Sequence, residues 1–209
     1  YRYSQRKNVF EKFDVFPANN EVNNMVLAFA IIGGEIWVTD GKSKFASIDC
    51  KTHKVKTLFE VPPILKINRL GEYMPVVDKK LQVWFTSGNL LYRFNPADKS
   101  VQVFKLHLSW PVAPVDFDVA GISLQEDKQL LGIATNKGFI LFDIAKQQQI
   151  NVNDPEKYTV NENIWCVKAD KDGFLISTGS HPLLKISWEG KNIISLIDKK
   201  VLDFESGRG

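Results

Sequence analysis

One pattern recurs four times along this chain of 209 residues, and it restricts the fold more than any other feature. In each copy an apolar run ends in threonine, a short turn follows, and a second apolar run ends at a polar residue. The threonines are Thr39, Thr86, Thr135 and Thr178, at intervals of 47, 49 and 43 residues. The polar residues are Asp49, Asn95, Asp143 and Ser187, at intervals of 46, 48 and 44 residues. Because two separate markers keep nearly the same period, we infer an internal repeat.

The second copy shows what one unit contains. Its sequence predicts four short strands at 72–77, 82–86, 90–95 and 100–106, since the residues around 81–86 alternate with the period of two that strands have. Asn95-Pro-Ala-Asp98 supplies turn residues between the last two strands. In the fourth copy, Asp172-Gly173 suits a type I′ turn before the second strand. No segment keeps a helical period beyond about ten residues, so we expect almost no helix.

Four-stranded units that recur every 40–50 residues or so are typical of the blades of a β-propeller. The sequence therefore predicts an all-β fold, namely a β-propeller of about four to five four-stranded blades or a fragment of a larger one. A single propeller region then covers residues 1–209, with blades at about 25–61, 72–108, 117–152 and 161–199. A half blade at 1–16 precedes them, and the first strand of a further blade follows at 201–204.

Large aromatic residues recur within these units. A blade cannot bury both of its faces alone, so neighbouring blades pack their apolar faces against each other. We expect six aromatic residues to pack between blades: Trp37, Trp84, Trp165, Phe139, Phe142 and Phe174.

The first residues resemble the second half of a unit. Tyr1-Arg-Tyr-Ser4 aligns with Tyr92-Arg-Phe-Asn95, and Ser4 precedes Asp49 by 45 residues, which is one repeat. We therefore expect the chain to begin with the third and fourth strands of a blade. Two explanations of the ends stay open: the two termini share one closing blade, or further blades belong to a longer protein.

Charge and reactive residues exclude several classes of function. The net charge is only +3, and no basic block of five or more residues occurs, so nucleic acid is not an expected partner. Cys50 and Cys166 lack the spacing of a metal site and are expected to be strand thiols, with their redox state open. His53, His107 and His181 fall at different repeat positions. We predict no metal site, no cofactor and no catalytic residue in this chain.

The second and third strands of each unit carry a recognisable pattern. Glu35-Ile-Trp-Val-Thr39, and Gln82-Val-Trp-Phe-Thr86 with Leu91-Tyr-Arg-Phe-Asn95, resemble the two-component regulator propeller repeat. Leu131-Gly-Ile-Ala-Thr135 keeps the Gly-Ile-x-Thr core without the tryptophan, and Asp170-Lys-Asp-Gly173 keeps the preceding turn. The resemblance covers nearly the whole chain.

This resemblance implies the extracytoplasmic sensor region of a hybrid two-component histidine kinase. It implies a periplasmic location, in the outer part of an inner-membrane protein, and a role in signal transduction. Many such sensors detect carbohydrate fragments, so an oligosaccharide is the ligand that the resemblance implies. The other domains of the same sensor would be partners, and a homodimer is an alternative partner.

Two long connections are the best candidates for a binding surface, because loops on a rigid scaffold commonly carry function. The segment 107–114 presents Trp110 directly before Pro111, with Pro114 three residues further on, and the segment 62–73 adds Arg69, Glu72 and Tyr73. Aromatic faces beside charged groups suit a sugar, which offers C–H faces and hydroxyls. A structural role for Trp110, covering the end of a blade, stays open.

Three other functions stay open. A propeller enzyme, such as a lyase or a quinoprotein-type dehydrogenase, would need a metal or quinone centre. A purely structural interaction propeller would bind other proteins without sensing. An intracellular scaffold of the tryptophan–aspartate repeat type is disfavoured, because that dipeptide is absent.

Overall fold

The computed structural model describes residues 2–4, 8–11, 15, 27–40, 44–60, 75–108, 117–150, 152, 163–179 and 183–196. These residues form β-strands and turns and contain no helix, so the predicted all-β class is confirmed. The chain divides into two compact units, residues 1–71 and 72–209, and each unit is described by itself.

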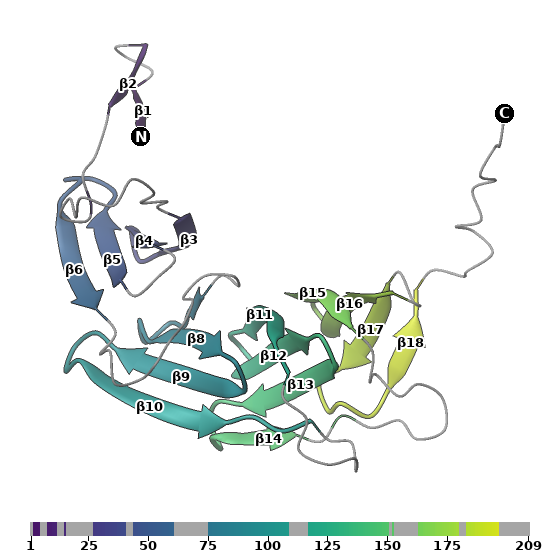
Figure 1. Ribbon diagram of the computed structural model, residues 1–209. Helices are drawn as coiled ribbons and strands as arrows, with labels where there is room; N and C mark the ends of the chain where they lie inside the picture. Colours follow the sequence, from purple (N-terminus) through teal and green to yellow (C-terminus); the bar gives the residue numbers. More distant parts are fainter. Residues whose placement is uncertain are drawn as a thin grey trace, which may run out of the picture. The chain divides into compact units, whose positions relative to one another are not determined.

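The first unit contains a hairpin and one four-stranded sheet (Figure 1). The hairpin pairs β1 (Arg2–Ser4) with β2 (Val9–Glu11). The first sheet is antiparallel, and its strands follow the chain order: β3 (Leu27–Ile32), β4 (Glu35–Thr39), β5 (Lys44–Asp49) and β6 (Val55–Glu60).

The second unit contains three more antiparallel sheets of four strands each, which lie side by side in Figure 1. The second sheet comprises β7 (Val76–Val77), β8 (Val83–Ser87), β9 (Leu90–Asn95) and β10 (Ser100–Lys105). The third sheet comprises β11 (Val119–Gln125), β12 (Leu130–Thr135), β13 (Gly138–Asp143) and β14 (Gln148–Ile150). The fourth sheet comprises β15 (Ile164–Ala169), β16 (Gly173–Thr178), β17 (Leu184–Ser187) and β18 (Ile193–Ser195).

The recurring polar residue ends the third strand of each sheet and caps the hairpin that follows. Asp49 Oδ1 accepts hydrogen bonds from the N–H groups of Lys51 and Thr52, at 2.9 and 2.7 Å. Asn95 and Asp143 accept equivalent hydrogen bonds from the N–H groups of Ala97 and Lys146, at 3.1 and 2.9 Å. Ser187 Oγ instead accepts from the Asn192 N–H, five residues on, at 3.3 Å. Short polar side chains that bond their own turn stabilise it locally, which explains why this marker keeps the repeat period.

Four residues after three of these capping residues, the backbone adopts the left-handed conformation, with a positive φ. His53, Lys99 and Gln147 have φ angles of 59°, 61° and 55°. Asn8 has a φ of 51° and lies four positions after Ser4, which pairs with Val9 as Asn95 pairs with Ser100. The hairpin β1–β2 therefore has the geometry of the third and fourth strands of a blade.

The recurring threonine lies at or near the end of the second strand of each sheet. All four threonines are buried, with at most 8% of their surface exposed. Thr135 shows one reason for the residue type: its hydroxyl donates to the Gly138 carbonyl at 2.8 Å and accepts from the Lys137 N–H at 3.1 Å. The side chain thereby closes the turn between β12 and β13.

The third sheet is buried on both faces. Alternate residues of β12 and β13 point to opposite sides, as the pleat requires. One set packs with Trp84, Leu91 and Leu106 of the second-sheet region, and comprises Leu131, Ile133, Ile140 and Phe142. The other set packs with Phe174, Ile176 and Ile186 of the fourth sheet, and comprises Leu130, Ala134, Phe139 and Leu141.

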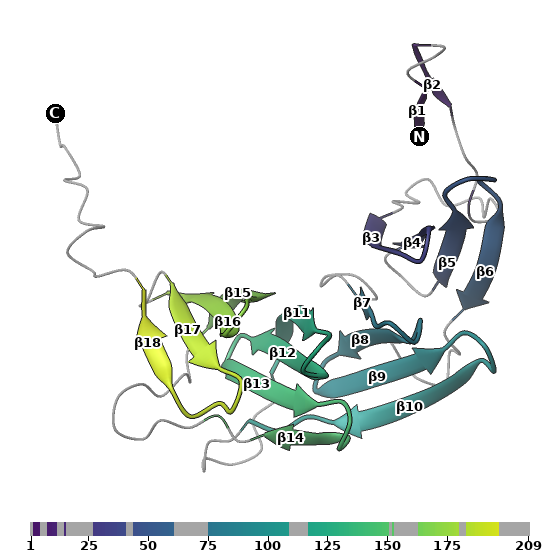
Figure 2. The same cartoon turned by 180° about the vertical axis from the view of Figure 1, so that it is seen from behind.

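The first strands of these sheets meet one another. β11 contacts β7 and β8 on one side and β15 on the other, and β15 also contacts β12. Figure 2 shows β15 beside β11, and β18 on the far side of the fourth sheet. Because the first strands gather and the fourth strands lie outside, sheets two to four have the arrangement of consecutive propeller blades.

Two expectations from the sequence are wrong. Trp37, Trp84, Phe139, Phe142 and Phe174 are buried as expected, but Trp165 is 65% exposed and is covered by no described sheet. Gly173 does not belong to a type I′ turn, because neither it nor Asp172 has a positive φ. It begins β16 instead, where a Cβ would lie 2.1 Å from the Ile186 carbonyl oxygen of β17. Close backbone approach, rather than turn geometry, requires glycine there.

Candidate binding surface

The four predicted binding residues lie outside the described residues. Arg69, Glu72 and Tyr73 belong to the segment 61–74, and Trp110 belongs to the segment 109–116. The structure therefore neither brings them together nor separates them. The structure does describe the residues on either side of the segment 109–116, where the chain leaves the second sheet and where it enters the third.

The segment that carries Trp110 leaves the second sheet at a side-chain clamp. Gln149 on β14 accepts a hydrogen bond from the His107 N–H through Oε1, at 2.7 Å. Its Nε2 donates to the His107 carbonyl oxygen at 2.6 Å. One amide side chain thus binds both backbone groups of His107, as a neighbouring strand would. These two hydrogen bonds connect the residues that follow β10 to the third sheet.

The same segment enters the third sheet at a second clamp. The Asp118 N–H donates to Asn136 Oδ1 at 3.0 Å, and the Asn136 N–H donates to the Asp118 carbonyl oxygen at 2.9 Å. Asp118 precedes β11, while Asn136 follows β12. Both ends of the Trp110 segment are therefore held by hydrogen bonds to the third sheet.

Reasoning from the sequence missed both clamps. Asn136 carries a weak signal, because an asparagine after a strand is a common turn residue. Gln149 carries none, because its partner lies 42 residues away.

Charged hairpins tie the second and third sheets together at the turns between their first and second strands. Glu126 Oε1 accepts from the Lys79 N–H at 2.9 Å, and Lys79 Nζ lies 2.8 Å from Asp127 Oδ1. The hydrogen bond with Asp127 raises the pKa of Lys79, and the same bond lowers the pKa of Asp127. Both side chains are largely exposed, so the pair orients the hairpins more than it stabilises the fold.

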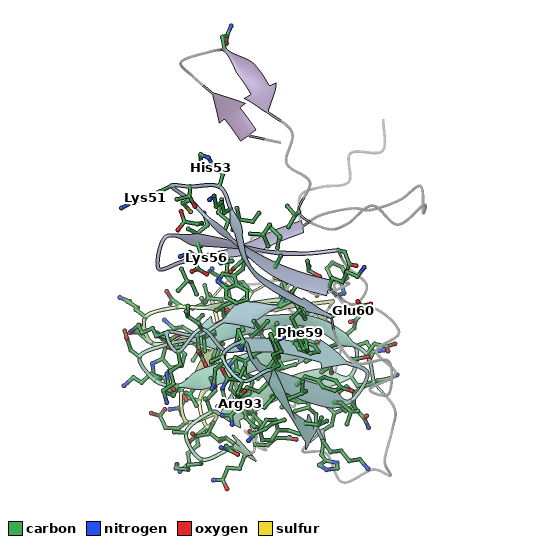
Figure 3. All side chains as sticks on the ribbon, turned by 90° about the vertical axis from the view of Figure 1, so that its left-hand side faces the viewer. Lys51, His53, Lys56, Phe59, Glu60 and Arg93 are labelled. Carbon is green, nitrogen blue, oxygen red and sulfur yellow. The ribbon has the colours of Figure 1, made fainter. Side chains whose placement is uncertain are left out.

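The first unit has a charge cluster of three residues, Lys56, Glu35 and Asp49. Figure 3 labels Lys56, together with Lys51 and His53 of the turn between β5 and β6. Lys56 Nζ lies 2.9 Å from Glu35 Oε1 and 3.1 Å from Asp49 Oδ2. Hydrogen bonds to Glu35 and then Asp49 raise the pKa of Lys56. Two hydrogen bonds hold the pKa of Asp49 far below its ordinary value: the larger effect comes from the Thr52 N–H and the next from the Lys56 side chain. The cluster fixes the hairpin from β5 to β6.

Cys50 and Cys166 are free thiols, and Cys166 Sγ lies 3.2 Å from Ser177 Oγ. Within the described ranges, no three or more His, Cys, Asp or Glu residues are grouped so that they could hold a metal ion. The same ranges contain no helix with the length and apolar character that crossing a membrane requires.

The solved structures that resemble this chain include the following three. The Saccharomyces cerevisiae Sqt1 structure has a TM-score of 0.66 and 13% identity, covering 93% of this chain and 54% of its own. The Neurospora crassa Pan2 WD40 domain has a TM-score of 0.54 and 13% identity, covering 78% of this chain and 46% of its own. U3-55K has a TM-score of 0.55 and 8% identity, covering 81% of this chain and 54% of its own. No protein-family model and no curated protein matches the sequence.

At 8–13% identity, these likenesses show the fold alone, which is a WD40-like β-propeller. The predicted propeller class is thereby confirmed. This chain spans about half the length of the solved chains, so its four sheets correspond to part of such a propeller. The dipeptide Trp-Asp is absent from this sequence.

Proposed function

We propose that this chain is a non-catalytic binding module that presents Trp110 to a carbohydrate fragment. One observation carries the proposal: the segment that bears Trp110 is clamped at both ends, by Gln149 at His107 and by Asn136 at Asp118. A loop held at both ends on a rigid scaffold loses less conformational entropy when a ligand binds, so more of the contact energy appears as affinity.

The chemistry of the predicted residues suits a sugar. An indole ring stacks on the apolar C–H face of a pyranose, and tryptophan is frequent at binding hot spots. Arg69 and Glu72 would supply a donor and an acceptor for hydroxyl groups, and Tyr73 a second aromatic face.

The setting of this module is part of the proposal. The resemblance of the repeats to the two-component regulator propeller supports an extracytoplasmic sensor, located in the periplasm as the outer part of an inner-membrane protein. Ligand binding would then be read by other domains of the same sensor. A propeller fold by itself hosts many functions, so the proposal depends on the Trp110 segment and not on the fold.

The test is a titration of the purified chain with a panel of oligosaccharides by isothermal calorimetry. Trp110→Ala is expected to weaken binding at least about tenfold, which corresponds to about 1.4 kcal/mol, with an unchanged unfolding midpoint. Trp165→Ala is the matched control, because Trp165 is exposed but lies on β15, outside the clamped segment. Equal affinity of Trp110→Ala and the wild-type chain, or no binding of any sugar, would overturn the proposal.

A second variant tests the role of the clamp. Gln149→Leu removes both hydrogen bonds to His107 and keeps Trp110. If the clamp positions the segment, this variant binds the same sugar more weakly, with an entropy of binding that is less favourable than that of the wild-type chain. An unchanged affinity would mean that the clamp serves stability alone.

A propeller enzyme remains the alternative from another class. Elemental analysis and an absorbance spectrum of the purified chain would reveal the metal or quinone centre that such an enzyme needs.

A further inference from the structure

The fourth sheet has one covered face and one open face. Phe174, Ile176 and Ile186 point toward the third sheet and are fully buried. The strand registers place the alternate residues on the opposite side, which we call the outer face. The outer face comprises Cys166, Lys168, Leu175, Ser177, Leu183, Lys185, Ile194 and Leu196, with Trp165 at its edge.

Much of this outer face is apolar and unprotected. Trp165, Ile194 and Leu196 are 65%, 51% and 45% exposed. Leu175 and Leu183 between them are only partly buried. Solvent-facing sheet faces normally carry polar residues, and an exposed apolar patch marks an interaction surface.

The outer face corresponds, residue by residue, to a face that is covered elsewhere in the molecule. Leu175 and Lys185 pair across β16 and β17 as Gly132 and Leu141 pair across β12 and β13. Ile194 pairs with Lys185 as Ile150 pairs with Leu141. On the third sheet, these positions pack against the fourth sheet. The outer face is therefore the next interface in the same series.

The one partly buried charge on the outer face is already neutralised. Lys185 Nζ lies 2.9 Å from Asp170 Oδ2 and 2.9 Å from Asp172 Oδ2, and its side chain is only 15% exposed. Covering an unpaired lysine would be strongly unfavourable. Because two carboxylates of its own sheet pair with Lys185, another sheet can cover this face without leaving that charge alone.

The first strands share a feature that identifies what fits here. A β-bulge near the start of β11 lies between Val119 and Gly121, and an equivalent bulge in β15 lies between Ile164 and Cys166. The extra residue shifts the alternation, so apolar residues three apart, rather than two or four, face the preceding sheet. They are Val119 and Ile122 in β11, and Ile164 and Val167 in β15.

We propose that residues 197–209 dock on the outer face of the fourth sheet and contribute the first strand of a further blade. Val201 and Phe204 are three residues apart and repeat the spacing of Ile164 and Val167. The link from β18 to Val201 has five residues, 196–200, and is shorter than the links of thirteen residues that lead from β10 to β11 and from β14 to β15. An extended chain of five residues still spans about 17 Å, which is enough to cross a four-stranded sheet with strands about 4.8 Å apart. Both of those first strands contact the first strand of the preceding sheet, so 201–204 lies beside β15. This docking does not depend on the ligand proposed above.

The equivalence predicts one specific contact. A Cβ built on Gly121 of the third sheet would lie 3.6 Å from Val167 Cγ1 of the fourth. Cys166 occupies the position of Gly121, because each is the first paired residue after its bulge. Phe204 occupies the position of Val167. The side chain of Phe204 therefore lies on Cys166.

Disulfide trapping tests this contact in the full chain. In a Cys50→Ser background, Phe204→Cys leaves Cys166 and the new thiol as the two cysteines, and oxidised glutathione joins them by thiol–disulfide exchange. Disulfides need Cβ atoms about 3.5–4.5 Å apart, so the contact is a demanding one. Leu202→Cys is the matched control, because residue 202 corresponds to the bulged position and faces away from Cys166.

The expected result is an intramolecular disulfide, mapped by mass spectrometry, that forms with Phe204→Cys and at least about tenfold more slowly with Leu202→Cys. Equal rates for the two variants would overturn the proposal. Disulfides between molecules would overturn it too, in favour of a second copy of the chain on this face.

Thiol accessibility gives a readout that needs no new cysteine. In the Cys50→Ser chain, Cys166 is the only thiol, and docking of 197–209 would slow its labelling by a soluble disulfide reagent. Adding Val201→Asp and Phe204→Asp together is expected to raise the labelling rate at least about fivefold with the fold intact, because charged residues do not dock on an apolar face. An unchanged rate would overturn the proposal.

Discussion

The ring of Phe174 lies directly against the backbone of Gly132, so that a Cβ on Gly132 would lie 2.6 Å from Phe174 Cδ1. Phe174 is fully buried between the third and fourth sheets, and its ring also meets Trp188 edge-on, with centroids 5.1 Å apart. The absence of a side chain at Gly132 therefore determines how closely the two sheets approach.

Gly132→Ala is expected to destabilise the second unit by about 1–3 kcal/mol, because an added methyl group in a packed core forces side chains or backbone to move. Gly121→Ala is the matched control, since its Cβ would meet Val167 at an ordinary 3.6 Å. Urea unfolding followed by tryptophan fluorescence measures both. A similar loss in the two variants would show that the contact with Phe174 is not the cause.

A buried carboxylate organises the turn before β8. Asp78 is 2% exposed; its Oδ1 accepts from the N–H groups of Lys80 and Gln82, and its Oδ2 accepts from Trp84 Nε1 at 2.9 Å. Asp78→Ala is expected to cost at least about 2 kcal/mol, because it leaves the buried indole N–H and the turn without their acceptor. The same unfolding experiment measures this loss.

A comparison of Trp84 with Trp37 isolates the contribution of the hydrogen bond between Trp84 Nε1 and Asp78. Trp37 occupies the position in β4 that Trp84 occupies in β8, but its buried Nε1 has no hydrogen-bond partner among the described residues. Trp84→Phe is therefore expected to cost more than Trp37→Phe, by about 1–2 kcal/mol. Equal costs would mean that ring volume decides, and not the bond to Asp78.

The pH dependence of the first unit follows from Asp49. Its pKa is lowered in the folded chain, chiefly by the Thr52 N–H and then by Lys56, whereas an unfolded chain restores the ordinary value of about 4. The stabilisation is therefore fully present above about pH 4 and is lost as the pH falls through the lowered pKa. The difference in thermal midpoint between the wild-type chain and Asp49→Asn is expected to shrink below pH 4 or so. A constant difference down to strongly acidic pH would contradict this.

Strained hairpins offer a stabilising substitution. Lys99 has a φ of 61°, a left-handed conformation that is unfavourable for a residue with a Cβ. Lys99→Gly is expected to stabilise the second unit by about 0.5–1 kcal/mol, since glycine adopts this conformation freely. Asp98→Gly, one residue earlier, is expected to destabilise, because it removes the bond from the Ser100 N–H. Thermal unfolding measures both variants, and a midpoint for Lys99→Gly at or below that of the wild-type chain would contradict the prediction.

Local chemistry made much of the fold predictable from the sequence. Asn95 and Asp143 bond backbone groups two and three residues away, so their signal lies within the sequence of one hairpin. The periodic threonines are equally readable, because each is buried near the end of a second strand. Period and residue type together were enough to predict four four-stranded sheets.

Features that depend on distant partners were not predictable. Gln149 binds His107, 42 residues earlier, and nothing in its own segment indicates this. Gly173 has the sequence of a turn residue, but the backbone of β17 is what excludes a side chain there. The exposure of Trp165 depends on whether a further sheet covers the fourth one, and the sequence of β15 contains no such information.

The burial of the third sheet on both faces has a consequence for its dynamics. Amide groups of β12 and β13 reach solvent only if the sheet separates from a neighbour, because each strand packs on the second sheet through one set of residues and on the fourth through the other. Fraying from an edge cannot expose them. Hydrogen exchange in these strands should therefore follow cooperative opening of the whole second unit, while β10, β14 and β18 exchange by local fluctuations. The third sheet thus couples its two neighbours into one folding unit.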